Sequence, residues 1–151
     1  AGVGCVTREH VEQAATRSLE TSVYQLTREL LQNHYQQVYE VLHRLFYQRE
    51  KPIMILSVLS GCYVDLYRAK AAASAGVPAE SLAAEFKYRG REFVLRNAAR
   101  DSARLSLPTL RRCLDVLAQA DTQLKSGRAD EERGVLEKTV AKLIVLAKSG
   151  R

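Results

Sequence analysis

Apolar side chains recur every three or four positions along most of the chain, which is the period of a helix with one buried face. In residues 22–32, for example, Val23, Leu26 and Leu30 would lie on the same side of one helix. No segment alternates between apolar and polar residues long enough to predict a strand, apart from the short run at residues 3–6. The pattern therefore predicts an all-α fold.

About eight helices follow from this pattern and from the residues that typically begin or interrupt a helix. Thr7 is a suitable N-cap for a short first helix, and the serine and threonine at residues 18–21 predict a break after it. The connections are short, so neighbouring helices should pack nearly antiparallel as a bundle. The remaining predicted helices cover residues 22–32, 35–48, 53–75, 78–86, 91–104, 107–127 and 130–148.

The predicted helix at residues 53–75 should be the central one, because apolar side chains lie almost all round it. Pro52 would open this helix, and Gly76 would end it in the left-handed conformation. Gly127 is expected to supply a left-handed cap of the same kind to the helix that precedes it.

Length and composition limit the class of protein. A chain of 151 residues fits one domain, or one domain with a small piece of another, and its net charge of +6 is compatible with nucleic acid or an acidic partner. No apolar run reaches the roughly 20 residues of a bilayer span, and the first residues show no signal-peptide pattern, so we expect no membrane contact. The lack of an initiator methionine fits a part of a longer protein. Cys5, Cys62 and Cys113 have no zinc-like spacing and indicate reduced thiols of a cytosolic protein.

The sequence offers no catalytic motif. It contains no glycine-rich phosphate loop, no dinucleotide-binding fingerprint and no zinc-protease or nucleophile-elbow pattern. His10, His34 and His43 have no acidic, cysteine or serine partner in a catalytic spacing. We therefore expect no catalytic residue, no metal site and no cofactor. An enzyme whose site is assembled from residues far apart in the sequence is the weakest alternative.

Basic residues are concentrated between residues 87 and 112, a segment that contains eight basic residues and only two acidic ones. Arg96, Arg100 and Arg104 follow one another at intervals of four and should line one helix face. Like charges at that spacing destabilise a helix slightly, so an anionic partner would explain them. Three interpretations stay open for this series and for Arg89 in the turn before it: a solvated face, a contact with DNA phosphate and a contact with another protein of an assembly.

The same region also has the order of a helix-turn-helix. A predicted helix at residues 78–86 and a turn precede the basic helix at residues 91–104, in which Arg96 and Asn97 suit base reading. A small basic helical DNA-binding regulator is therefore the alternative function. The seven tyrosines are more typical of half-buried packing residues, and Tyr88, in the basic turn, is the one candidate for stacking on a base.

The helix at residues 107–127 carries the most informative signature of the chain. It ends in Ala120-Asp121 followed, after two residues, by Leu124-Lys125-Ser126-Gly127. Asp121 precedes Lys125 by one helical turn and can pair with it, and a cation suits the last turn of a helix. Arg128 should project from the turn between two long helices, where Lys125 and Arg128 are candidate contacts to a neighbouring protein or to DNA.

Several short motifs occur in a fixed order along the chain. They are Ser18-Leu19-Glu20 with Val23-Tyr24-Gln25-Leu26, Lys51-Pro52 before the apolar helix, Arg104-Leu105-Ser106-Leu107 with Leu110, and then Ala120-Asp121 with Leu124-Lys125-Ser126-Gly127. In this order and spacing the sequence resembles the C-terminal domain of the delta subunit of bacterial DNA polymerase III, the subunit that opens the sliding clamp within the clamp loader.

This resemblance implies that residues 1–20 close a lid subdomain related to AAA+ proteins and that residues 21–151 form a helical collar domain. It implies a non-catalytic role in which the collar packs against the gamma or tau and delta-prime subunits of the loader. The sliding clamp would be contacted only by an N-terminal domain outside this sequence, and primer-template DNA is a further candidate partner. The implied location is the bacterial cytoplasm, in the replisome at the nucleoid.

Overall fold

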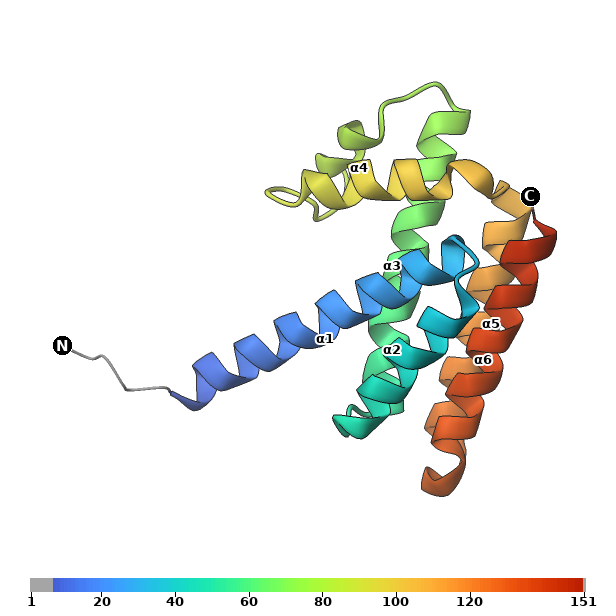
Figure 1. The fold of residues 1–151 in the computed structure, drawn as a ribbon. Helices are drawn as coiled ribbons and strands as arrows, with labels where there is room; N and C mark the ends of the chain where they lie inside the picture. The colour runs from blue at the N-terminus through green and yellow to red at the C-terminus, as the bar shows by residue number, and fades with distance from the viewer. Residues whose placement is uncertain (1–6, 151) are drawn as a thin grey trace.

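The computed structural model describes residues 7–150, and this part of the chain is helical without a strand (Figure 1). Within that range, the six α-helices are α1 (Arg8–Leu31), α2 (Tyr35–Tyr47), α3 (Pro52–Ser74), α4 (Glu92–Asp101), α5 (Leu107–Ser126) and α6 (Glu132–Ser149). The three short 3-10 turns are η1 (Ala79–Ala83), η2 (Ser102–Arg104) and η3 (Ala129–Glu131). The predicted all-α fold is confirmed, whereas the predicted number of about eight helices is too high. Cys5 and the run at residues 3–6 lie outside the described residues.

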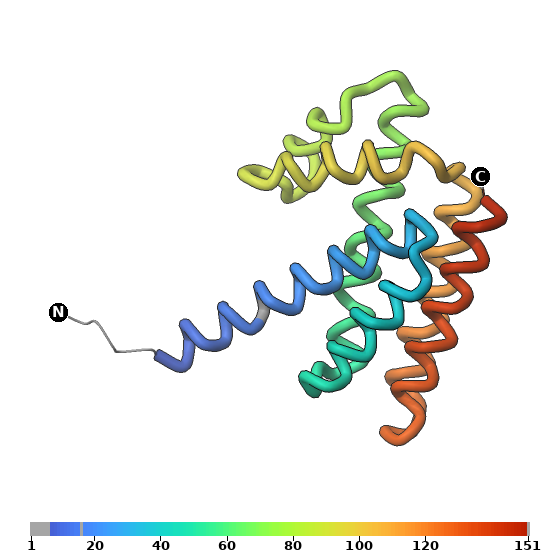
Figure 2. Tube along the Cα trace, in the orientation of Figure 1, coloured from blue at the N-terminus to red at the C-terminus, as the bar shows by residue number. Residues whose placement is uncertain are grey.

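The helices pack around α3, which runs through the middle of the molecule (Figures 1 and 2). α5 and α6 form an antiparallel pair on one side of it, and α1 and α2 cross another side. α4 lies across the end of α3 and leads through η2 into α5. The largest fully buried side chains include Leu26, Leu42, Leu59, Tyr63, Leu117 and Leu136. This core holds two surface regions in place: the turn that joins α5 to α6, and the region where the end of α1 lies near α4.

α3 is the central helix, as its sequence predicted. Pro52 occupies its first turn, where a missing N–H removes no helical hydrogen bond. α3 packs against α1, α4, α5 and α6, which is why apolar side chains are needed on several of its sides. Tyr63 is completely buried in this helix, and its hydroxyl has no hydrogen-bond partner within residues 7–150.

Three helices end in the same way, with a left-handed residue just after the last turn. These residues are Asn33 (φ 61°), Arg49 (φ 59°) and Gly76 (φ 72°). In each case the next N–H returns to a carbonyl of the last turn, as the N–H of Val77 does to Ala72 at 2.9 Å. The predicted left-handed Gly76 is confirmed. Arg49 carries a full side chain in a conformation that favours glycine.

The predicted break at residues 18–21 is wrong, because α1 continues through it as a single helix. Leu19 and Val23 are both buried, so the apolar face of the helix runs across the expected break. The hydroxyl of Thr21 donates to the Arg17 carbonyl at 2.8 Å, within the helix, instead of capping a new one. Packing against the core outweighs the local preference for a cap.

Two other predicted helices are shorter than expected. Residues 78–86 form only the turn η1 and irregular turns after it, and the Ser81 hydroxyl donates to the Pro78 carbonyl at 2.7 Å. The segment predicted as helical at residues 91–104 ends at Asp101 as α4 and continues as η2. A helix-turn-helix requires two α-helices joined by a turn, so the described structure lacks the arrangement on which the alternative regulator depended.

Candidate functional site

The signature motif lies at the end of α5, where the chain turns back into α6 (Figure 1). Ala120 and Leu124 are buried in the core. Asp121 and Lys125 lie nearer the surface and form the predicted ion pair, with 2.8 Å between Lys125 Nζ and Asp121 Oδ2. The Ser126 hydroxyl donates to a backbone carbonyl one turn earlier, at 2.8 Å. The motif therefore anchors the hairpin in the core and presents a polar turn outside it.

Gly127 is extended, with φ −89° and ψ −179°, so the predicted left-handed cap is wrong. Its N–H donates to the carbonyl of Gln123 at 2.8 Å. A Cβ built at this position would lie 2.6 Å from the same carbonyl oxygen, closer than real Cβ atoms approach. Glycine is required here because two backbone segments approach closely, and not because of a positive φ.

Arg128 follows this turn and is exposed, with 79% of its side chain accessible. Its Nε lies 3.5 Å from Asp130 Oδ1. A hollow of about 480 Å³ lies beside it, between the end of α5 and the start of α6. Its charged lining side chains are Arg128, Glu131, Glu132, Lys138 and Lys142. Lys138 and Lys142 were not expected at this turn, although their spacing of four puts both on one face of α6.

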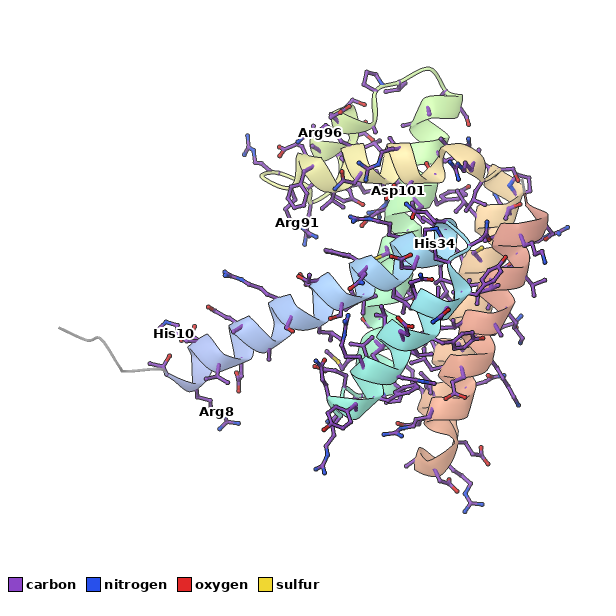
Figure 3. All side chains as sticks on the ribbon, in the orientation of Figure 1. Arg8, His10, His34, Arg91, Arg96 and Asp101 are labelled. Carbon is purple, nitrogen blue, oxygen red and sulfur yellow. The ribbon has the colours of Figure 1, made fainter. Side chains whose placement is uncertain are left out.

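Arg96, Arg100 and Arg104 do not line one helix face, contrary to the prediction. α4 ends at Asp101, so Arg104 belongs to η2. Arg100 and Arg104 line a hollow of about 420 Å³, and Arg96 is not among its lining residues. Figure 3 shows Arg96 on α4 well away from Asp101, which does line this hollow. Arg96 and Arg100 therefore share a face of α4, but only Arg100 and Arg104 line the hollow.

The end of α1 completes this hollow, and nothing in the local sequence pattern connects it with the arginines of α4. Arg28 lies in the last turn of α1, and His34 follows before α2 begins. The Nδ1 atom of His34 lies 2.6 Å from Glu29 Oε2, which holds the imidazole at the edge of the hollow. His34 and Asp101 face the same region in Figure 3. We call this feature the arginine hollow; its lining residues are Arg28, Leu31, Gln32, His34, Arg100, Asp101 and Arg104.

Tyr88 is buried, with 4% of its surface exposed, so the prediction that it stacks on a base is wrong. Arg68 Nη1 donates to the Tyr88 hydroxyl at 3.0 Å, and that hydroxyl donates to the Asp65 carboxylate. The Arg68 guanidinium also lies 4.0 Å from the centre of the Phe86 ring. These contacts fasten the turn that carries the exposed Arg89 to α3.

The buried cluster also changes the acidity of its members. Burial raises the pKa of the Asp65 carboxyl, and the hydrogen bond from Tyr88 together with the nearby Arg91 and Arg68 charges opposes this rise. Burial raises the pKa of Tyr88 as well, and its hydrogen bond to Asp65 acts in the same direction. We interpret the cluster as structural, because its contacts join the turn to α3.

The described thiols are poor nucleophiles. Burial raises the pKa of Cys62 to about 11 and that of Cys113 to about 11, so both stay protonated at neutral pH. Cys62 lines a small hollow of about 90 Å³ between α1, α3 and α4. Within residues 7–150, no group of three or more histidine, cysteine or acidic side chains is arranged to hold a metal ion. Nor does that range contain a helix both long and apolar enough to cross a membrane.

The first half of α1 extends away from the bundle (Figure 2). Its side chains from residue 8 to residue 15 are exposed, and so are Arg17 and Ser18. Val11 is 54% exposed, and Ala14 and Ala15 on the same side of the helix are exposed as well. This part of the helix is a second candidate surface, separate from the end of the α5–α6 hairpin.

The comparisons with known proteins agree with one another. Residues 20–143 match the family model of the DNA polymerase III delta subunit, C-terminal domain. The chain is 27% identical over 128 residues to DNA polymerase III subunit delta of Bacillus subtilis (strain 168), a match that covers 84% of the chain and 36% of that protein. Its fold is similar to that of the Bacillus subtilis DNA clamp loader delta protein, with a TM-score of 0.74 and 24% identity.

The structural match covers 93% of this chain and 40% of the clamp loader delta protein, so the chain spans well under half the length of either relative. The family match, in contrast, covers most of the chain and includes the whole signature motif. On that basis the chain belongs to the family formed by the C-terminal domains of DNA polymerase III delta subunits.

Proposed function

We propose that the chain acts as the collar domain of a clamp-loader delta subunit and holds the subunits of the loader together without catalysing a reaction itself. The family match over residues 20–143 carries this proposal. The similarity of the fold to the Bacillus subtilis clamp loader delta protein supports it. A bundle whose apolar side chains are buried around α3 leaves polar helix faces and turns for such contacts.

The partners that we propose are the gamma or tau and delta-prime subunits. The end of the α5–α6 hairpin is the most suitable surface for one of them, because Lys125 and Arg128 lie there on a turn fixed by Gly127. A turn held between two packed helices loses little conformational entropy on association. The sliding clamp would be contacted only by an N-terminal domain outside this sequence, in keeping with the greater length of the relatives.

The proposed division of the chain places residues 1–20 in a lid subdomain related to AAA+ proteins and residues 21–151 in the collar. α1 crosses this boundary as one helix, and its first half is exposed with Val11 unburied. The exposed apolar side chains Val11, Ala14 and Ala15 on a projecting helix suit packing against a neighbouring subdomain. The location that goes with this function is the bacterial cytoplasm, in the replisome.

Primer-template DNA is proposed as a second partner. Arg89, Arg96, Arg100 and Arg104 are all exposed, and the chain carries a net charge of +6. Exposed guanidinium groups bind phosphate through paired hydrogen bonds and release counterions from DNA. Neither this contact nor assembly requires a cofactor or a metal ion.

Assembly can be tested by mixing the chain with the collar domains of gamma and delta-prime and measuring co-elution at micromolar concentration. Replacing Lys125 and Arg128 with alanine should weaken the complex by about tenfold, since a few residues, arginine often among them, carry most of the energy of an interface. Replacing Lys51 and Lys148, two exposed lysines elsewhere, should leave it unchanged. Separate peaks for the unchanged chain would contradict the proposed function.

A further inference from the structure

The arginine hollow brings three guanidinium groups together from two distant parts of the chain. Arg28 comes from the last turn of α1, Arg100 from the last turn of α4 and Arg104 from η2. We propose that this hollow binds a phosphate group of a nucleic-acid backbone, with these three arginines as its ligands. The proposal deepens the DNA contact of the proposed function and rests on it, but it is independent of the assembly of the loader.

The three positions are held in place by the fold. The Lys70 ammonium of α3 donates to the Ala103 carbonyl at 3.3 Å, which ties η2 to the central helix. Ser102 is 1% exposed and its hydroxyl donates to the Ala99 carbonyl at 3.3 Å, while Leu105 is buried on the other side of the turn. Arg104 therefore leaves a fixed backbone, and a fixed backbone lowers the entropic cost of binding a ligand.

The charges of the hollow are not neutralised within it. The side chains of Arg28 and Arg104 take part in no ion pair or hydrogen bond in the described part of the chain. Arg100 Nε lies 3.1 Å from Asp101 Oδ1, and the side chain of Arg100 remains 64% exposed. Apart from His34, the lining residues carry three positive charges and one negative charge, that of Asp101. Glu29 adds a carboxylate at the edge, where it is engaged with His34.

Helix geometry explains only part of this arrangement. Arg28 and Arg100 each lie in the last turn of a helix, where a cation offsets the negative end of the helix dipole. Arg104 lies beyond α4, in a 3-10 turn of three residues, where this effect is weak. Its position beside the other two is therefore better explained by a shared anion.

The lining favours phosphate over an acidic segment of a protein. Leu31 is the one large apolar side chain among the lining residues, so a peptide would find little apolar surface on which to anchor. Guanidinium groups match the oxygens of a phosphate in pairs, and several such groups around one hollow strengthen that preference. The net charge of +6 would in addition attract a polyanion from a distance.

The test measures binding of the whole chain to a short fluorescein-labelled DNA duplex by anisotropy over a range of salt concentrations. Arg28→Ala with Arg104→Ala should lower the affinity by about tenfold and reduce the slope of log K against log salt by about 1, because the contact with one phosphate is lost. Lys51→Ala with Lys148→Ala removes the same charge from exposed positions outside the hollow and should lower the affinity by less than about threefold.

A conservative variant keeps the test decisive if the alanine variant folds poorly. Arg28→Lys with Arg104→Lys retains both charges and should keep the salt slope while losing several-fold in affinity, since lysine cannot form the paired hydrogen bonds. Circular dichroism would verify that each variant is helical. Inorganic pyrophosphate should compete with the duplex for the unchanged chain and no longer compete for the alanine variant.

Three results would overturn the proposal. Equal losses in the two alanine variants would mean that DNA responds only to total charge. Competition by polyglutamate at the concentration at which pyrophosphate competes would assign the hollow to an acidic segment of a protein. Pyrophosphate binding without any duplex binding would assign it to a free anion. Co-elution with gamma and delta-prime in any of these cases would leave the assembly function intact.

Discussion

Replacing Gly127 with alanine should destabilise the end of the α5–α6 hairpin, although the backbone there is one that any residue can adopt. With φ −89° and ψ −179°, alanine has no dihedral penalty at this position. The whole effect should come from the added Cβ, which would lie 2.6 Å from the Gln123 carbonyl oxygen. That oxygen belongs to the backbone of α5 and cannot rotate away as the end of a flexible side chain would.

The size of the effect follows from what must move. The turn has to shift by about half an ångström or more, which strains the well-packed hairpin by about 1–3 kcal/mol. The hydrogen bond from the Gly127 N–H to the same oxygen, 2.8 Å long, is weakened at the same time and contributes about 1 kcal/mol when intact. We expect a loss of about 2 kcal/mol in the free energy of unfolding, or a melting temperature lower by about 4–8 °C.

Gly61 and Gly134 provide matched controls for this substitution. Both lie inside helices, α3 and α6, and a Cβ at either position meets no heavy atom within 4 Å. Alanine should therefore stabilise the chain by about 0.5–1 kcal/mol at Gly61, because glycine in a helix interior costs that amount, and by less at Gly134, which lies in the first turn of α6. Urea denaturation followed by circular dichroism measures all three variants on one scale.

The functional consequence of the Gly127 substitution can be measured on the same protein. A displaced turn moves Arg128, so co-elution with the gamma and delta-prime collar domains should weaken as stability falls. If Gly127→Ala matches the unchanged chain in stability, or behaves like Gly61→Ala, the close approach of the two backbone segments does not determine this position and the interpretation fails.

Three further predictions concern the interior and the helix ends. Arg49→Gly should raise the free energy of unfolding by about 1 kcal/mol, because φ is 59° there and glycine adopts that conformation without strain; no change in the urea midpoint would contradict this. Tyr63→Phe should raise it by about 1 kcal/mol, because the removed hydroxyl is buried without a partner among the described residues; a loss of stability would reveal an interaction that we have missed. Burial raises the pKa of Asp65 above its ordinary value of 3.8. The protonated carboxyl therefore stabilises the folded chain fully below pH 3.8, and this stabilisation is lost as the pH rises through the raised pKa. The stability of Asp65→Asn relative to the unchanged chain should accordingly increase with pH across the acidic range, and a difference that is constant with pH would refute this reasoning.

The central helix could be predicted because its signal is local and strong. Apolar side chains around the whole of residues 53–75 leave no other place for it than the middle, and Pro52 and Gly76 mark its ends by their backbone chemistry. The ion pair between Asp121 and Lys125 was predictable for the same reason, since one helical turn fixes their separation.

Features that depend on distant packing could not be found in this way. The serine and threonine at residues 18–21 have a local tendency to cap a helix, but the burial of Leu19 and Val23 against the core outweighs it. Tyr88 stands in a basic, polar sequence and is nevertheless buried, because Asp65 and Arg68 of α3 satisfy its hydroxyl. A tertiary contact of this kind leaves no trace in the spacing of neighbouring residues.

The two glycine assignments show a subtler limit. A glycine after a helix has the same sequence signature whether it is needed for a positive φ, as at Gly76, or for a close approach, as at Gly127. The arginine hollow illustrates the long-range case, because Arg28 becomes a neighbour of Arg104 only when α1 and η2 pack at the same end of the bundle. Only three-dimensional coordinates separate the two glycines or bring the two arginines together.

The unbroken course of α1 makes its outer half a lever arm. Residues 8–18 form a rod about 16 Å long at 1.5 Å per residue, so a tilt of about 10° at the bundle would displace its tip by about 3 Å. A flexible joint at residues 18–21 would have absorbed such a tilt; a stiff helix transmits it to whatever is attached at Arg8.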